Sequence, residues 1–401
     1  KMYRLDRCQD QASLFYDTLC NVVDKYAPRT TVLLKNNDKP WVTASFTLCV
    51  DDRNRAFSSG DHKHYRQLRN KVNRLRCELR ARFVKNKLTN LKKDNNRKWW
   101  SEVKGLCGFV NKERGDFSGV TIPGTVVSEQ FIADYVNKLL VDVTHNVPAL
   151  DNLAVVAAGE NVSQCPDAFV VTEFEVYNVL TRLNAHKASL CDIIDNGLLR
   201  ALAACLSAPI CSLINASIRQ STVPDQWKLS RVTLIPKVIP IRNLEKDIRP
   251  ISITCPVSKV AEWFIDRFFE EHFSEHLDPA QFGNTKGRST LLALIKFMHT
   301  LYISADDCRN IIRILFVDFR KAFELIDHTV LRDKLEYYNF PPHLSRWLLT
   351  FLSNRRQFVK VGSSCSTTLS THAGAPQGTR AGPNIFKVLI NDPKFSLDAI
   401  K

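Results

Sequence analysis

One carboxylate stands where an apolar run gives way to polar residues. In ILFVDFRKAFELIDH, residues 314–328, four apolar residues lead directly into Asp318, and Glu324 and Asp327 follow at helical spacing. Taken alone, the pattern favours Asp318 as the N-cap of a helix that begins directly after it. The alternative is a carboxylate fixed at the end of a strand to hold a divalent cation, because Mg2+ prefers oxygen ligands on rigid elements.

Two further segments carry residue types that could bind phosphates or a flat ligand. RVTLIPK at 231–237 ends on Lys237, and DIRPIS at 247–252 carries Arg249 before a proline that favours an extended backbone. A lysine and an arginine placed in this way can neutralise a triphosphate or a nucleic-acid backbone. The loop AGAPQGTRAGPNIF at 373–386 has glycines that allow its backbone to approach a ligand closely. Each signal is weak alone, since basic edge strands and glycine-containing helix entries are common.

Hydrophobic periodicity indicates the elements that must position these residues. A strand over 311–317 is expected to deliver Asp318, and residues 357–361 and 366–369 are expected to form a hairpin. Helices before residue 220 and mixed strands and helices after it indicate an α+β fold with an all-α N-terminal part. Ser207 is expected to cap one of the helices, which are predicted within 1–28 and at about 65–88, 128–140, 172–183, 196–205, 208–220, 257–272, 289–304 and 383–391.

The formal net charge of +15 is concentrated in one block of the chain. Residues 51–114 hold 19 Lys and Arg against 7 Asp and Glu, whereas the rest of the chain holds 37 against 34. Such a block predicts a polyanionic partner, and the alternative is a solvated basic helix surface with no partner. The side chains expected to contact nucleic acid are Arg66, Arg69, Lys71, Arg74, Arg76 and Arg80.

Cysteine spacing and hydropathy argue against two further classes of protein. The 12 cysteines are scattered without a C-x-x-C pair, which suits a reducing compartment and offers no zinc site. The longest apolar-rich run, residues 201–218, is interrupted by polar residues and a proline, as in packed helices rather than a membrane span. We therefore expect no membrane segment and a location inside the cell, in the nucleus, the cytoplasm or both.

Taken together, the segments resemble the reverse transcriptases of non-LTR (LINE-type) retrotransposons. FVDFRKAFELIDH at 316–328 is similar to motif A of that family, and APQGTRAGPNIFKVLINDP at 375–393 is similar to motif B. RPISITCPVSKVAE at 249–262 and QFGNTKGRST at 281–290 resemble the finger motifs that precede motif A. Further upstream, PWVT, YRQLRNKVNRL and WWSEVKGLCG are similar to the connector between the family's endonuclease and polymerase domains. The resemblance therefore covers nearly the whole chain.

The resemblance implies roles for individual residues. Asp318 corresponds to the metal-binding carboxylate of motif A, and the backbone carbonyl of Phe319 would be a second ligand. Phe323 corresponds to the aromatic gate under the incoming sugar, where a ring would clash with the 2′-hydroxyl of a ribonucleotide. Gln377 and Gly378 correspond to the motif B positions that line the nucleotide pocket.

The same resemblance implies the reaction and its partners. Lys237 and Arg249 correspond to basic finger residues that hold template or triphosphate. The expected reaction is RNA-directed DNA synthesis, in which two Mg2+ ions about 3.5–4 Å apart clamp the attacking and leaving oxygens of a nucleotidyl transfer. The expected partners are an RNA template, the RNA–DNA hybrid and deoxynucleoside triphosphates. The residues do not indicate an oligomeric state.

The implied fold is a right-hand polymerase, with fingers and an incomplete ferredoxin-like palm, preceded by an all-α basic region. The corresponding boundaries are 1–115 for a helical basic connector, 116–168 for a linker, 169–305 for fingers with N-terminal helices, and 306–401 for a partial palm with motifs A and B.

The chain departs from the family's pattern in three places. The paired aspartate of motif C is not found before Lys401, and Glu324 stands where the family usually has Asp. In KASLCDIIDNGLL at 187–199, Leu190 and Cys191 replace a Gly-Pro turn. We therefore expect a truncated piece of a longer reading frame, with an incomplete two-ion site and no activity alone. The alternatives are a non-catalytic RNA-binding remnant of a retroelement protein and a maturase-like RNA chaperone on the same fold.

Overall fold

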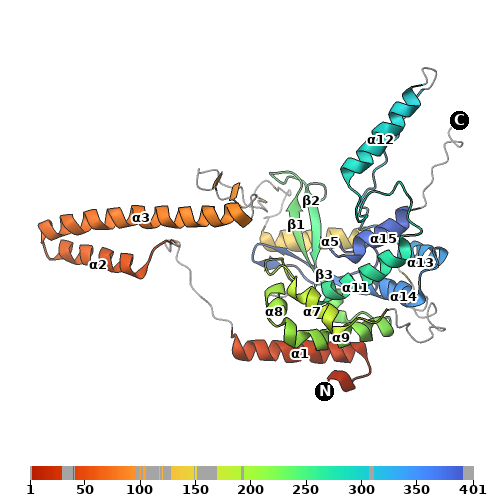
Figure 1. The fold of residues 1–401 in the computed structure, drawn as a ribbon, viewed down its shortest axis with the longest axis horizontal. Helices are drawn as coiled ribbons and strands as arrows, with labels where there is room; N and C mark the ends of the chain where they lie inside the picture. Colours follow the sequence, from red (N-terminus) through yellow and green to blue (C-terminus); the bar gives the residue numbers. More distant parts are fainter. Residues whose placement is uncertain are drawn as a thin grey trace. The chain divides into compact units, whose positions relative to one another are not determined.

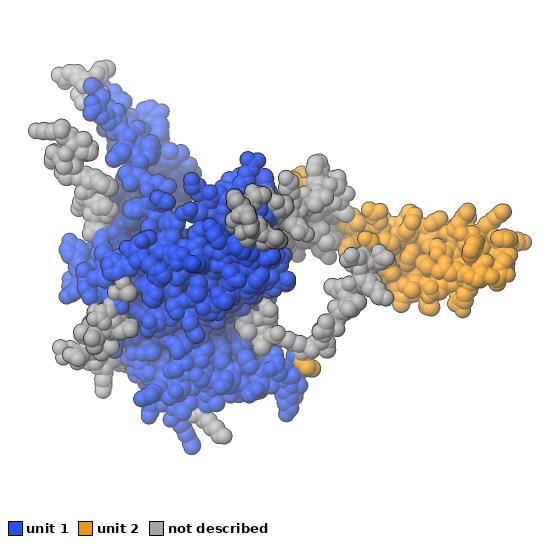
Figure 2. All heavy atoms as spheres, turned by 180° about the vertical axis from the view of Figure 1, so that it is seen from behind, with its two compact units in different colours: residues 1–27, 115–401 blue, residues 28–114 orange. Residues whose placement is uncertain are grey.

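The chain forms two compact units in the computed structural model. The model describes residues 2–28, 41–94, 128–148, 169–190, 194–306 and 311–391, with positions 39, 99–100, 103–104, 117, 120 and 150. Residues 1–27 and 115–401 form one unit, here called the core unit, and residues 28–114 form the other, here called the basic unit (Figure 2). The domain boundaries inferred from sequence stay a prediction.

The basic unit is a pair of helices joined by a tight turn (Figure 1). Helix α2 spans Ala44–Ser58, and its N-terminus is capped by the Thr43 hydroxyl, which accepts from the Phe46 N–H at 3.3 Å. Helix α3 spans His62–Asp94. Apolar side chains at intervals of three and four along α3 are buried or half-buried, as the periodicity predicted, and α2, which was not predicted, packs against α3.

Helices make up most of the core unit, and the predicted ones are largely confirmed. Helix α9 begins earlier than expected, so Ser207 lies inside it, where its hydroxyl donates to Glu173 at 3.1 Å instead of capping. Helices α10, α13 and α14 were not predicted. The helices and one 3-10 turn are η1 Met2–Arg4, α1 Cys8–Tyr26, α5 Glu129–Thr144, α7 Glu173–Thr181, α8 Asn196–Ala201, α9 Ala203–Arg219, α10 Asp225–Lys228, α11 Pro256–Phe273, α12 Thr290–Ala305, α13 His328–Tyr337, α14 Pro342–Leu352 and α15 Ala381–Ile390.

A small mixed sheet gathers segments that are distant in sequence. Strand β1 (Leu229–Pro236) pairs antiparallel with β2 (Ile248–Ile253) and parallel with β3 (Arg355–Val361). Short strands β4 (Ser364–Cys365) and β5 (Leu369–Thr371) both pair antiparallel with β3. The structure is therefore mixed α+β, and the sheet brings the basic segments of β1 and β2 beside the chain that leads into α15.

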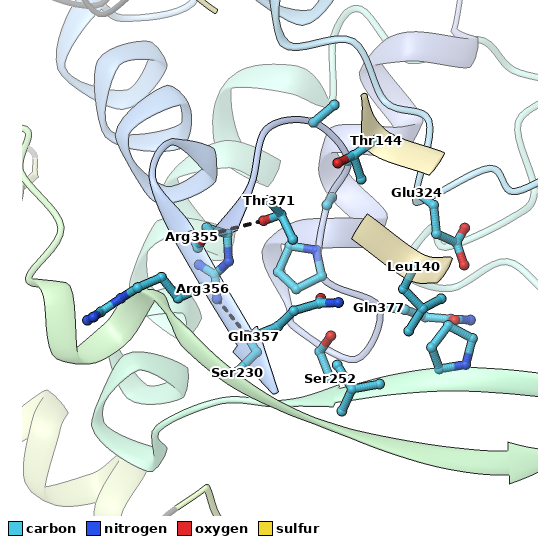
Figure 3. A pocket seen from close by; sticks show the side chains of 16 residues that line it. Leu140, Thr144, Ser230, Ser252, Glu324, Arg355, Arg356, Gln357, Thr371 and Gln377 are labelled. Atoms are coloured by element: carbon cyan, nitrogen blue, oxygen red, sulfur yellow. Dashed lines mark hydrogen bonds between the residues drawn. The ribbon is translucent and has the colours of Figure 1, made fainter. Parts of the chain in front are cut away.

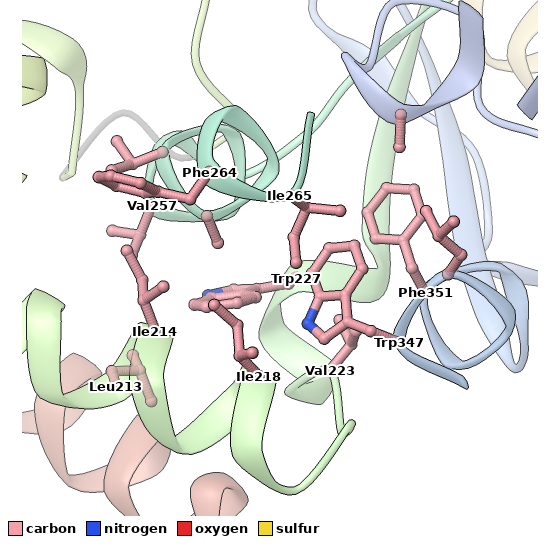
Figure 4. Packing of buried hydrophobic residues seen from close by; sticks show 14 of the residues in the cluster. Leu213, Ile214, Ile218, Val223, Trp227, Val257, Phe264, Ile265, Trp347 and Phe351 are labelled. Carbon is pink, nitrogen blue, oxygen red and sulfur yellow. The ribbon is translucent and has the colours of Figure 1, made fainter. Parts of the chain in front are cut away.

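Two apolar clusters hold the core unit together. In the larger one, Trp227 and Trp347 are fully enclosed among aliphatic and aromatic side chains from α9, α11 and α14 (Figure 4). The smaller cluster packs Ile132 and Val136 of α5 against Val232 and Val359 of the sheet. Helix α5 falls in the segment predicted as a linker, yet it is an integral part of the core, because its apolar face is covered by the sheet.

The strand expected over 311–317 is not formed. Residues 311–319 have no regular secondary structure, and the side chains of Ile311, Leu315 and Phe316 are 85%, 73% and 81% exposed. A strand needs a neighbour for its backbone hydrogen bonds, and none of the described strands lies beside this segment. Helix α12, just before it, likewise has no buried residue. Among the described helices, none has the length and apolarity to cross a membrane.

Candidate active site

A cavity of about 420 Å3 in the core unit brings together most of the residues singled out in the sequence. Charged side chains reach it from the end of β1, from β2 and the loop between these strands, and from the segment after α12, which also supplies aromatic rings. The amide of Gln377 reaches it from the loop before α15. Gly378, which was also predicted to line the nucleotide pocket, directly follows Gln377 in the sequence. The predicted residues that line the cavity are Lys237, Arg249, Asp318, Phe319, Phe323 and Gln377.

Backbone hydrogen bonds join the segment after Asp318 to the loop before α15. The Ala375 N–H donates to the Phe323 carbonyl at 2.8 Å, and the Gly374 N–H donates to the Ile326 carbonyl at 2.9 Å. These bonds fix the chain a few residues beyond Asp318, which itself is exposed at the cavity. The carboxylate is therefore positioned from its C-terminal side and not by a strand that precedes it.

Gly374 is required by the closeness of this contact. Its φ is +82°, and a Cβ at this position would lie 2.7 Å from the Glu324 carbonyl oxygen and 2.9 Å from that of Phe323. The buried imidazole of His328 adds a third link, since its Nε2 lies 2.8 Å from the Gly374 carbonyl oxygen. Burial lowers the pKa of His328, and the carbonyl contact partly opposes that shift.

The loop that carries Gln377 is held from two sides. The Ser252 N–H of β2 donates to the Gln377 carbonyl at 2.7 Å, and Gly378, with φ +114°, leaves only 2.8 Å between an added Cβ and the Ser252 carbonyl oxygen. On the other side, the buried carboxylate of Glu262 accepts from the Arg380 N–H at 2.7 Å. Burial raises the pKa of Glu262, and the Arg380 N–H opposes that shift.

A row of acidic side chains on α11 sets the position of α15. Glu262, Asp266 and Glu270 recur at every fourth position and therefore share one face of the helix. Asn384 and Lys387 of α15 donate to Asp266 and Glu270 respectively. The sequence analysis did not identify this row. It could have been found from acidic residues that recur on a helix face whose other residues are apolar.

The ring of Phe323 has a fixed orientation at the cavity wall. It stacks on Phe386 of α15 with a centroid distance of 5.6 Å and an interplanar angle of 28°. Phe319 meets the same ring edge-on at 5.7 Å. The half-buried Phe323 side chain can therefore act as a rigid wall against whatever fills the cavity.

A smaller hollow lies next to the cavity and shares Glu324, Gln377 and Leu140 with it (Figure 3). Arg355 lies on its other side, where it donates to the Ser230 hydroxyl at 3.0 Å. Burial lowers the pKa of Arg355 to about 10, and the charge of Glu262 opposes that shift. We interpret Arg355 as a structural cation, because its guanidinium is enclosed and hydrogen bonded.

Sequence reasoning also missed one wall of the cavity and one ion pair. Leu139, Leu140 and Val143 of α5 line the cavity, although α5 was assigned to a linker. Its place on the sheet is fixed by polar contacts, for example the Asn137 amide donating to the Thr367 carbonyl at 2.8 Å. The ion pair joins Lys321 to Glu245, both of which line the cavity, and no spacing in the sequence connects these two residues.

The residues at the cavity fit part of a Mg2+ site and do not complete one. Asp318 offers an exposed carboxylate, and Glu324 and Glu245 line the same cavity. No group of three or more His, Cys, Asp or Glu side chains that could hold a metal occurs within the described part of the chain. Mg2+ takes near-octahedral oxygen coordination, so further ligands are required.

The residues predicted to contact nucleic acid lie in the basic unit. All six are exposed along α3, on faces that do not pack against α2. Arg74 also pairs with Glu78 at 3.9 Å, and both side chains remain largely solvent-accessible. Such charges are free to contact phosphates, at little cost in lost ion pairing.

Comparison with known proteins identifies similar sequences. Residues 235–400 match the family model described as reverse transcriptase (RNA-dependent DNA polymerase). The chain is 31% identical, over 54% of its length and 24% of the relative's, to the probable RNA-directed DNA polymerase from transposon X-element of Drosophila melanogaster. It is 26% identical, over 55% of its length and 24% of the relative's, to the RNA-directed DNA polymerase from mobile element jockey of the same species. The chain therefore spans about a quarter of the length of these relatives.

Proposed function

We propose that the core unit, whose residues 235–400 match the reverse transcriptase family model, binds a deoxynucleoside triphosphate during RNA-directed DNA synthesis. The observation that carries the proposal is the cavity, where basic, acidic, aromatic and amide side chains meet from distant parts of the chain. A nucleotide offers a matching sequence of groups, namely charged phosphates, a sugar and a polar base.

In this proposal each wall of the cavity contacts a different part of the nucleotide. Lys237 and Arg249 neutralise the triphosphate through charge-assisted hydrogen bonds. The ring of Phe323, held by Phe386, excludes a 2′-hydroxyl and so selects a deoxyribose. Gln377 approaches the nucleotide from the loop before α15.

Reverse transcriptase domains generally use divalent metal ions. We propose that Asp318 and the Phe319 carbonyl are the ligands that this chain contributes to Mg2+, which would offset phosphate charge. The described residues do not complete a two-ion site. We therefore also propose that the chain on its own binds nucleotide and Mg2+ but does not extend a primer.

The proposed partners of the basic unit are the RNA template and its hybrid with DNA. The exposed basic side chains of α3 support this part of the proposal. An RNA partner also implies that the protein works inside the cell, in the nucleus or the cytoplasm. A non-catalytic RNA-binding protein is the second candidate, favoured by the absence of a complete metal cluster within the described residues.

The RNA-binding part of the proposal predicts a steep dependence on salt. Each phosphate contacted contributes about 0.7 to the slope of log affinity against log salt for a single strand. Replacing Arg66, Arg69 and Arg74 by glutamine should therefore reduce the slope by about 2. Fluorescence anisotropy with a labelled single-stranded RNA measures both slopes, and a flat response in the unaltered chain would contradict RNA binding by these residues.

The two candidate functions differ in nucleotide binding. We expect the full chain to bind dATP more tightly than ATP, which differs only by the 2′-hydroxyl, and Phe323→Val to narrow that difference. Equilibrium dialysis gives the four dissociation constants, and thermal unfolding checks that the variant is folded. Binding of RNA without either nucleotide would favour the non-catalytic candidate. Equal binding of both nucleotides by the unaltered chain would rule out the gate at Phe323.

A further inference from the structure

A third cation lines the cavity, and it already has a partner. Lys321 lines the cavity together with Lys237 and Arg249. Its Nζ lies 3.3 Å from Oε1 of Glu245, which also lines the cavity. By contrast, the exposed Arg249 has no ion pair with any described residue. One of the three cations is therefore neutralised in the structure by a carboxylate that competes with an anionic ligand.

Glu245 is presented to the cavity by a closed loop between β1 and β2. The side-chain oxygen of Asn243 accepts from the Glu245 N–H at 2.8 Å and from the Lys246 N–H at 3.0 Å. The Asp247 carboxylate accepts from the Arg242 N–H at 3.0 Å. Because these bonds fix the shape of the loop, the approach of Glu245 to Lys321 is a built feature of the fold.

The backbone at Lys321 is unusual for its residue type. Its φ of +54° lies in the left-handed region, which is unfavourable for a long side chain. Of the other non-glycine residues with positive φ in the described part of the chain, Asn284, Asn339 and Asn354 are of the type that tolerates this region best. Gly or Asn would adopt this positive φ at a lower conformational cost, so the presence of lysine indicates that its side chain has a function.

We propose that Lys321 is a third contact for the triphosphate, and that Glu245 occupies it until the nucleotide arrives. This inference rests on the proposed nucleotide-binding function and adds a residue and an exchange step to it. The pair is partly exposed, so its net stabilisation is small. A triphosphate carries several charges and outcompetes one carboxylate for the ammonium group. On binding, a phosphate oxygen replaces Oε1 of Glu245 at Nζ, and the proton stays on Nζ.

The test measures binding of inorganic tripolyphosphate and of dATP to the full chain by titration calorimetry. Lys321→Gln should weaken both about tenfold, the usual effect of losing one charged hydrogen bond. Glu245→Gln should tighten both about threefold, because Lys321 is then free. In the Lys321→Gln background the same Glu245→Gln change should give little gain. Lys246→Gln is the matched control, since it removes a charge from the same loop at a residue that does not line the cavity.

The possible outcomes separate this inference from the function on which it rests. If the unaltered chain binds neither probe, the proposed function fails. If Arg249→Gln weakens binding and Lys321→Gln does not, the cavity binds phosphate and the role of Lys321 is wrong. If Glu245→Gln raises the affinity for both probes equally with and without Lys321, Glu245 acts only by repelling the phosphates. The proposed exchange of Glu245 for a phosphate at Lys321 is then wrong.

A stability measurement distinguishes binding from a structural role of Lys321. Asparagine suits positive φ, so Lys321→Asn should leave Tm unchanged or raise it while it weakens tripolyphosphate binding. A lower Tm together with weaker binding would assign Lys321 to the fold and would overturn the inference.

Discussion

The two sides of the cavity are built in different ways. On the side of α15, the Gln377 loop leads into a helix whose Ile385 and Val388 are fully buried in the main core. On the side of Asp318, the residues from 311 to 320 are exposed throughout. Both sides carry residues that stand out in the sequence, yet only one side is packed.

This difference indicates that residues which mark a functional site in the sequence need not lie on a buried, packed element of the fold. The apolar run before Asp318 suggested a buried strand, but what fixes Asp318 is the chain that follows it. Phe323 and Ile326 accept backbone hydrogen bonds from the loop that precedes α15. The exposed side of the cavity therefore depends on the packed side for its position.

The largest predicted effect contrasts one residue from each side. Ile385→Ala removes a fully buried side chain and should lower the free energy of unfolding by about 3 kcal/mol. Leu315→Ala, at a position that is 73% exposed, should change it by less than about 0.5 kcal/mol. Urea denaturation followed by tryptophan fluorescence measures both. A loss at Leu315 comparable to that at Ile385 would mean that the segment is packed in solution.

The contact between the two sides should be broken by Gly374→Ala. The added Cβ would meet two backbone carbonyl oxygens and would impose a side chain on a positive φ, at a cost of about 2 kcal/mol or more. The same experiment should show weaker dATP binding, since the segment after Asp318 would be displaced. Gly287→Ala is the matched control, because Gly287 also has positive φ (+76°) but an added Cβ meets nothing within 4 Å. Equal effects at the two glycines would mean that the close contact at Gly374 is not important.

The smallest predicted effect concerns pH and the His328 link. Burial holds the pKa of His328 below its ordinary value of 6.5, so the unfolded state binds the proton more tightly. Stability from this group is therefore present above pH 6.5 and is lost as the pH falls through that value. His328→Gln, which can keep a hydrogen bond to Gly374, should lose less stability between pH 7.5 and about 5.5 than the unaltered chain does. If the stability of the two proteins changed with pH in the same way, the pH dependence would not come from His328.

Much of the site could be predicted from the sequence because short motifs carry it. The periodicity predicted α11 and α15, and the resemblance to a known family brought together the residues at 237, 249, 318, 323 and 377, all five of which line one cavity in the structure. Their roles in catalysis and binding stay a prediction. The α+β class followed from the order of helices and strands.

The rest could not be predicted, since it depends on contacts between distant segments. The acidic row of α11 is recognisable only when α15 lies beside it, and the Glu245–Lys321 pair only when two loops meet. Helix α5 was assigned to a linker because glycine, proline and asparagine surround it in the sequence. The sheet that covers its apolar face is formed by β1, about a hundred positions further along the chain, and by β3, more than two hundred positions further.

The most direct test of the account measures how Mg2+ changes nucleotide affinity in the unaltered chain and in Asp318→Asn. If Asp318 lies at the triphosphate, Mg2+ should tighten dATP binding to the unaltered chain. The variant should lose most of that gain while its RNA affinity stays within about twofold, because the proposed function assigns RNA binding to charges on α3. An equal gain from Mg2+ in both proteins would show that the carboxylate takes no part in the nucleotide site, and the central claim would be wrong.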